Sequence, residues 1–237
     1  MPRPSDPHAR ARLLDAARTV FSERGLDRAK VEDITTGAQL SKGAFYLHFE
    51  SKEEAFRELL AGVVSNLDRM LNETSDQQLA TVPGDGAFAP YLDACHAKNL
   101  EIFEFVWDNR ALMAMVFDGG GSASYQHLIE DFAMRAQRQT AALIQHGIDI
   151  GLYRRDLDLE AAAAFIAGGY DRIARQMVRE QRKPDLDAML REVQWLFLGG
   201  MARPDVLAAL RQNEQKLSGN RDVERGESHA GRGVGPG

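Results

Sequence analysis

This sequence lacks several features on which whole classes of protein depend. It contains one cysteine, Cys95, so an internal disulfide is impossible and no cysteine cluster indicates structural zinc. No run of apolar residues approaches the length of a transmembrane helix, and no signal-peptide pattern opens the chain. We therefore expect a cytoplasmic protein that makes no membrane contact, in which Cys95 is a small buried apolar residue.

Strand patterns and catalytic motifs are also missing. Alternating apolar and polar residues with Asn-Gly or Asp-Gly turns are essentially absent, whereas apolar residues recur at helical spacing throughout the chain. The glycine-rich stretch 118–122 follows no predicted strand, so a phosphate loop is not expected there. The sequence predicts an all-α protein with no catalytic residue, no metal site and no cofactor.

The helical pattern divides the chain into consecutive segments. Gly25 and the Pro/Gly break at 81–87 are the clearest stops, and Asp158 is placed as an N-cap. The predicted helices span about 6–24, 31–38, 42–48, 52–73, 88–106, 109–117, 122–150, 159–181, 186–200 and 204–215.

The stretch SKGAFYLHFESKEEAF, residues 41–56, carries two helix-start signals ten residues apart. Ser41 opens a helix of about two turns, and Ser51 with Glu54 forms a capping box for the next one. A short helix reached by a tight turn from the preceding helix at 31–38 is typical of the helix-turn-helix, whose second helix enters the DNA major groove.

The two faces of this short helix differ in a way that suits a groove. Phe45 and Phe49 share one face and are expected to pack inward. Gly43, Ala44 and Leu47 lie opposite them, and this small, uncharged face would let the backbone approach base edges or touch a thymine methyl group.

Polar residues flank that face. Tyr46 and His48 lie towards the two groove walls, where each can hydrogen-bond a phosphate. Lys42 and Lys52 each occupy the first turn of a helix, where a lysine and the helix dipole can meet one phosphate. Residues 1–52 have a net charge of +2 and the remainder −8, so a mildly basic unit precedes an acidic body.

Residues 11–56, with AARTVFSERG, Ile34, Ala38 and SKGAFYLHFESKEEAF, resemble the DNA-binding domain of TetR-family transcriptional regulators. The resemblance implies a homodimer, a palindromic double-stranded DNA operator and a small-molecule effector that releases the DNA. The positions that it implies for DNA contact are Lys42, Gly43, Ala44, Tyr46, His48 and Lys52.

Two positions depart from the family pattern. Gln39 stands where the turn usually has Gly, so the turn is expected to take a slightly different form. Lys30 stands where the second helix usually begins with Thr or Ser, so the side-chain cap should be missing and Lys30 can instead reach a phosphate. Glu32 and Asp33 are expected to point away from DNA.

Two apolar helices, 159–181 and 186–200, are candidates for an isologous four-helix dimer interface. Gly168 and Gly169 indicate a close helix–helix approach, because glycine inside a helix is otherwise unfavourable. An intrachain core is the alternative. The candidate interface residues are Ile166, Tyr170, Ile173, Met177, Val193, Leu196 and Phe197.

The segment 98–132 is rich in aromatic residues and methionine, which suits a cavity for a largely apolar effector, although an ordinary core has the same composition. The candidate pocket residues are Phe103, Trp107, Met113, Met115, Phe117 and Tyr125.

These observations predict three parts of the chain. Residues 1–52 form a helix-turn-helix domain, residues 53–216 form a helical domain for ligand binding and dimerisation, and residues 217–237 form a disordered tail. We expect a DNA-binding transcriptional repressor and not an enzyme. The alternatives are a helical protein-interaction module and an activator of the same family.

Overall fold

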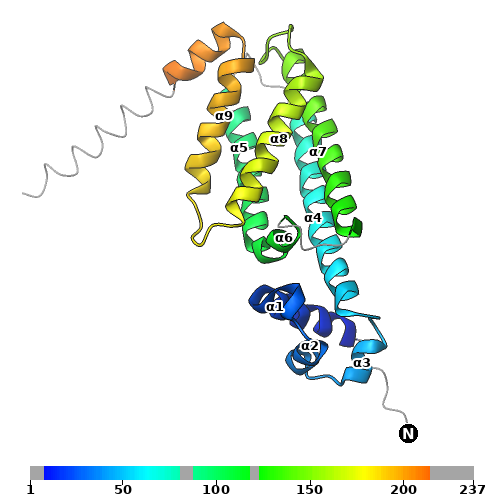
Figure 1. Cartoon of the computed structure of the whole chain (residues 1–237). Coiled ribbons are helices and arrows are strands. Elements are labelled where there is room, and N and C mark those ends of the chain that lie inside the picture. The colour runs from blue at the N-terminus through cyan, green and yellow to red at the C-terminus, as the bar shows by residue number, and fades with distance from the viewer. Residues whose placement is uncertain (1–7, 81–87, 118–122, 214–237) are drawn as a thin grey trace, which may run out of the picture.

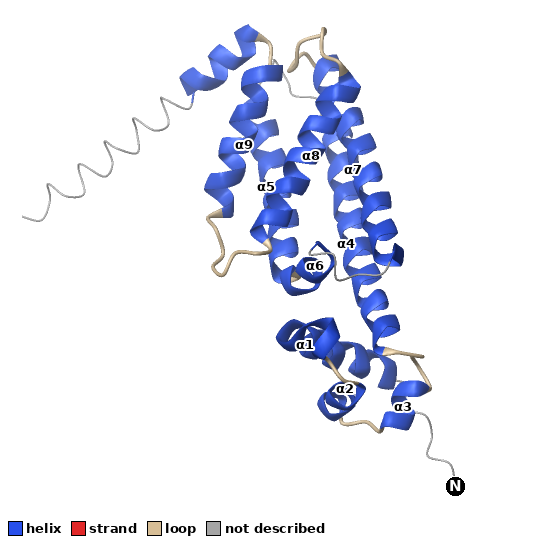
Figure 2. Cartoon of the chain, in the orientation of Figure 1, coloured by secondary structure: helices blue, strands red, loops and turns tan. Residues whose placement is uncertain are grey.

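The computed structural model describes residues 8–80, 88–117 and 123–213. Throughout these ranges the chain is helical with connecting loops, and it contains no strand there (Figure 2), which confirms the all-α prediction. The helices are α1 Ala9–Arg28, α2 Val31–Ala38, α3 Lys42–Tyr46, α4 Lys52–Ala80, α5 Phe88–Asp108, α6 Arg110–Phe117, α7 Ala123–Asp149, α8 Leu159–Met177 and α9 Leu186–Met201, and residues 204–213 are also helical.

The helices form a small unit and a larger body joined by α4. Figure 1 shows α1, α2 and α3 gathered at one end of the molecule, with α4 running from them into the body that α5 to α9 complete. α4 therefore belongs to both parts, because its first turns lie beside α1 and its remainder lies beside α7.

One apolar core continues from the small unit into the body. The ring of Phe21 in α1 packs edge-on against Phe56 in α4 at 5.4 Å, and Phe56 packs against Tyr125 in α7 at 5.2 Å. All three side chains are buried. Aromatic pairs in this geometry add to the stabilisation from burial alone, so the first turns of α4 are held from both sides.

Most predicted helices match the observed ones within a few residues. The predicted stop at Gly25 is confirmed, because Gly25 leaves the helical conformation (φ 71°, ψ 166°) and kinks α1, which resumes and ends at Arg28. Three helices end elsewhere than predicted. α8 ends at Met177 instead of residue 181. α3 ends at Tyr46 instead of residue 48. α4 reaches Ala80 instead of residue 73, because the sequence has no glycine or proline between residue 73 and Pro83. The predicted tail 217–237 lies outside the described residues.

None of the helices in the described ranges is long and apolar enough to cross a membrane. The same residues contain no group of three or more His, Cys, Asp or Glu side chains that could hold a metal ion.

Candidate nucleic-acid interface and effector cavity

The turn before α3 keeps a left-handed residue. Gln39 has φ 55° and ψ 42°, and the N–H of Leu40 donates to the Thr35 carbonyl at 2.9 Å, which closes the end of α2. The expectation that the turn would change its form is therefore wrong. Gln39 adopts the conformation that glycine adopts at lower cost, so the turn stores a small amount of strain.

α3 begins at a conventional cap. The Ser41 side chain accepts a hydrogen bond from the Ala44 N–H at 3.1 Å. By contrast, α2 begins after Lys30 with no side-chain cap, as its sequence predicts. The Lys30 side chain is exposed at this helix start.

The two faces of α3 are divided as its sequence predicts. Phe45 and Phe49 are buried in the core, whereas the exposed fraction is 52% for Tyr46 and 82% for Leu47. Gly43 is also exposed, and Ala44 and His48 are partly exposed. A leucine exposed to this degree is unusual on a three-helix unit whose other leucines are buried or partly buried, and together with the neighbouring Tyr46 it favours a surface made for contact.

Lys42 forms an ion pair with Glu32. Its Nζ lies 2.6 Å from a Glu32 carboxylate oxygen, and both side chains are more than half exposed. The hydrogen bond between them raises the pKa of Lys42 and lowers the pKa of Glu32. The Glu32 carboxylate thus lies beside the lysine that is expected to meet a phosphate, so the two expectations compete for this surface. Asp33 pairs instead with Arg24 at 2.7 Å.

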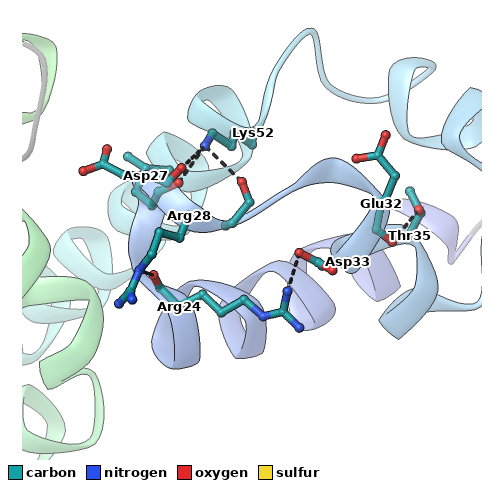
Figure 3. A network of polar contacts seen from close by, with 9 residues as sticks. Arg24, Asp27, Arg28, Glu32, Asp33, Thr35 and Lys52 are labelled. Atoms are coloured by element: carbon teal, nitrogen blue, oxygen red, sulfur yellow. Dashed lines mark hydrogen bonds and ion pairs between the residues drawn. The ribbon is translucent and has the colours of Figure 1, made fainter.

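Lys52 has a role that its sequence did not indicate. Its Nζ donates to the carbonyls of Leu26, Asp27 and Ala29 at 2.8, 3.0 and 3.0 Å (Figure 3). A lysine has three donors, so all of them are used within the chain. The ammonium group thus binds the end of α1 and the link to α2, where helix carbonyls lack partners.

The start of α4 is fixed by side chains on both sides. Ser51 Oγ accepts from the Glu54 N–H at 3.2 Å, and the Glu54 carboxylate accepts from the N–H of Glu50 at 2.6 Å, which is a capping box displaced by one residue. The hydroxyl of Tyr125 in α7 donates to the Glu53 carbonyl at 3.0 Å.

A second contact links the small unit to the body. Arg18 in α1 donates to Asn109 Oδ1 at 2.7 Å, and the Asn109 amide donates to the Phe105 carbonyl at 2.9 Å. Asn109 is buried at the break between α5 and α6. No local sequence motif predicts this contact, because the paired residues are 91 positions apart.

The body contains a mostly apolar cavity of about 390 Å³, bounded by side chains from α4 to α9. Of the predicted pocket residues, Phe103, Met113 and Phe117 line this cavity, whereas Trp107, Met115 and Tyr125 do not. Trp107 and Tyr125 are buried elsewhere in the core, where Tyr125 packs on α4. Helical spacing predicted that these side chains would be buried but not which of them border empty space.

The predicted dimer residues fall on different sides of α8 and α9. Met177 is buried in the core of the chain, and Tyr170 and Phe197 line the cavity, so these three face inward. Ile166 also lines the cavity, whereas Ile173 and Val193 are partly buried and Leu196 is 73% exposed. The other large apolar side chain that is exposed on these helices is Phe165, at 74%.

The comparisons with known proteins cover both parts of the chain. The family model described as "Bacterial regulatory proteins, tetR family" matches residues 13–59. The HTH-type transcriptional repressor KstR2 of Mycobacterium tuberculosis is 29% identical over 160 residues, which cover 66% of this chain and 75% of that protein. The HTH-type transcriptional repressor DhaR of Mycobacterium sp. strain GP1 is 28% identical over 185 residues, 76% of this chain and 88% of that protein.

Solved structures match over most of the chain. The structure of the ketosteroid transcriptional regulator KstR2 of Mycobacterium tuberculosis covers 84% of this chain and 97% of its own, with a TM-score of 0.59 and 25% identity. The complex of SmeT with triclosan covers 84% and 93%, with a TM-score of 0.64 and 20% identity. SmeT is the repressor of a multidrug efflux pump of Stenotrophomonas maltophilia.

Proposed function

This chain belongs to the TetR family of bacterial transcriptional regulators, and on that premise we propose that it is a homodimeric repressor of a palindromic operator, released by a small, largely apolar effector. The family consists of DNA-binding regulators, so the prediction that the chain is not an enzyme is confirmed. The observation that carries the proposal is the exposed face of α3, with Tyr46 and Leu47 directed outward beside a lysine.

The proposed roles follow the predicted parts of the chain. Residues 1–52 bind DNA, and residues 53–216 bind the effector and dimerise. The family match continues to residue 59, because Ala55 and Phe56 in α4 complete the core of the small unit.

On DNA, some residues of the small unit contact the bases and others contact the phosphates. Gly43, Ala44 and Leu47 approach base edges, where an apolar side chain discriminates through the thymine methyl group. The phosphate anchors are Lys30, Lys42, Tyr46 and His48. Lys52 acts indirectly, because its ammonium group is already bound to three carbonyls and holds the α1–α2 link in place.

The proposed dimer surface is the exposed side of α8 and α9. It combines Phe165 and Leu196 with Gly168, Gly199 and Gly200, all of them exposed. A Cβ atom built on any of these three glycines would meet nothing within 4 Å. Packing among the described residues therefore gives no reason for glycine, whereas a partner helix at close approach does.

The proposed effector release can act through the polar contacts between the body and the small unit. Asn109 accepts the hydrogen bond from Arg18 at the α5–α6 break. This break lies between Val106 and Met113, which both line the cavity. A ligand that moves either wall of the break would displace α1, and a small rotation misaligns two recognition helices spaced by about one helical turn of DNA, roughly 34 Å.

Selection of binding sites from random duplexes tests the proposal directly. The purified full chain should enrich an inverted repeat whose half-site centres lie about 10 base pairs or a multiple apart. Recovery of no sequence would instead favour the helical protein-interaction module. A reporter under the selected site should be repressed by the chain, and stimulation would identify an activator.

The oligomeric state tests the α8–α9 surface. Light scattering after size exclusion should give a dimer for the native chain and a monomer for the double variant Phe165→Glu/Leu196→Glu. Met134→Glu is the matched control, because Met134 is an exposed apolar residue of α7 outside this surface. A native monomer at micromolar concentration would defeat both dimerisation and palindromic binding.

A further inference from the structure

The wall of the cavity in the body carries almost no charge. It includes aromatic rings from α5 to α9, and among the described residues it contains no lysine, arginine or histidine. Asp171 is the one carboxylate among the described lining residues, and this group is paired with Arg175 at 2.7 Å. The Arg175 guanidinium also stacks on the Phe117 ring at 4.3 Å, so an anionic ligand would have to compete for it with both partners.

Burial makes this wall a poor environment for an anion. It raises the pKa of the Cys95 thiol to about 11 and that of the Tyr170 phenol to about 12. Burial also raises the pKa of the Tyr91 phenol. Carboxylates and phosphates are taken out of water only where cations and donors replace the lost hydration, and the described residues of the lining offer no free cation for that purpose.

The wall does offer hydrogen bonds to an uncharged group. The Asn99 amide donates to the Tyr170 hydroxyl at 3.2 Å. This bond leaves the Asn99 carbonyl as an acceptor and the Tyr170 O–H as a donor, both on side chains that line the cavity. The Phe103 and Phe197 rings lie beside Tyr170, at 5.7 and 5.6 Å, and provide apolar contact around this polar pair.

From this wall we infer that the effector is an uncharged lipophilic molecule with a hydroxyl or carbonyl group bound by Asn99 and Tyr170, and not a carboxylate or a coenzyme A thioester. The inference rests on the proposed function, since it names the chemical class of the ligand for the same cavity. The cavity volume of about 390 Å³ lies near the lower end of the range for small-molecule sites, which suits a compact ligand.

One carbon skeleton with different end groups separates the ligand classes. The full chain is loaded with the uncharged fluorophore N-phenyl-1-naphthylamine, which is then displaced at pH 7.5 by 6-phenylhexan-1-ol, 6-phenylhexanoate, its coenzyme A thioester and 6-phenylhexylamine. We expect the alcohol to displace the dye at concentrations about tenfold lower than either anion. The inference is overturned if an anion or the ammonium compound matches the alcohol, or if the uncharged dye does not bind.

Variants test the residues. Tyr170→Phe and Asn99→Leu should each weaken the alcohol about fivefold, which corresponds to one neutral hydrogen bond. Both variants should bind hexylbenzene, which has no polar group, as tightly as the native chain does. Weaker binding of hexylbenzene would reveal a general packing defect. Gln137→Lys places a cation on the wall and should improve binding of 6-phenylhexanoate relative to the alcohol. Equal losses for the alcohol and hexylbenzene would refute the role of the polar pair.

A separate measurement keeps this inference distinguishable from the proposed function. Release of a labelled duplex carrying the selected site is followed while the alcohol is added. An alcohol that displaces the dye but leaves the duplex bound would refute effector-released repression and retain the ligand class. Release of the duplex by the carboxylate alone would refute the inferred ligand class and retain effector-released repression.

Discussion

Replacement of Lys52 by alanine distinguishes the role that the structure gives this residue from a phosphate contact. The variant removes an ammonium group that is 2.8–3.0 Å from three carbonyls, of which those of Leu26 and Ala29 are partly buried and that of Asp27 is exposed. Water can replace the ammonium group at the exposed carbonyl. At the other two, an unsatisfied acceptor costs about 1–3 kcal/mol, reduced by the solvent that reaches a side chain still 21% exposed.

The expected loss of unfolding free energy for Lys52→Ala is therefore about 2–4 kcal/mol. For a chain of this size that loss lowers the melting temperature by roughly 5–15 °C. The measurement is urea or thermal unfolding followed by circular dichroism. Lys52→Met is the matched variant, because it keeps most of the aliphatic stem and removes the ammonium group with its three donors, and it should lose nearly as much.

Lys42→Ala should behave in the opposite way. Lys42 is exposed and pairs only with exposed Glu32, so its loss should change the unfolding free energy by less than about 0.5 kcal/mol. The same variant should lower the slope of log affinity against log salt by about one, because one phosphate contact is lost. If instead Lys52→Ala left stability unchanged and lowered that slope, the ammonium group of Lys52 would bind phosphate.

The other predictions concern single groups. Glu32→Gln releases Lys42 and removes a negative charge near the proposed phosphate contacts. Operator affinity at low salt, measured by fluorescence anisotropy, should therefore rise up to about fivefold. Gln39→Gly relieves a left-handed backbone and should stabilise the chain by about 1 kcal/mol in urea unfolding, and a loss would show that the Gln39 side chain contributes more than the strain costs. Gly25→Ala forces a side chain into a conformation almost confined to glycine and should cost about 1–3 kcal/mol. Gly147→Ala places a Cβ 2.2 Å from Tyr153 and should cost about 1–3 kcal/mol, whereas Gly62→Ala, with nothing within 4 Å, should gain about 0.5–1 kcal/mol as its control.

Local signals in the sequence predicted the small unit well. Capping residues and apolar spacing placed α2 and the starts of α3 and α4, and the helical repeat placed Phe45 and Phe49 inward. These features depend on residues within a few positions of one another, and the energy that determines them is local. The end of α4 was placed too early because residues 73–80 are mostly polar, although nothing there stops a helix.

Contacts between distant residues were not predictable in the same way. Lys52 reaches carbonyls 23–26 positions away. These acceptors belong to the backbone, so the residue types at those positions give no signal of the contact. α8 has apolar residues on more than one side, so its periodicity could not separate the stripe that faces the cavity from the one that faces solvent. Tyr170 was thereby assigned to the dimer interface and Phe165 left out of it, the reverse of what their exposure supports.

The first turn of α4 is where these long-range contacts meet. The Lys52 side chain binds the end of α1, and the carbonyl of the next residue, Glu53, receives the hydroxyl of Tyr125 from α7. Two neighbouring residues thus tie this turn to the small unit on one side and to the body on the other. Because Phe56 fills the space between Phe21 and Tyr125, the joint has little room to bend. A displacement of α7 by a ligand would therefore rotate the small unit as one body, which is the motion that the proposed operator release requires.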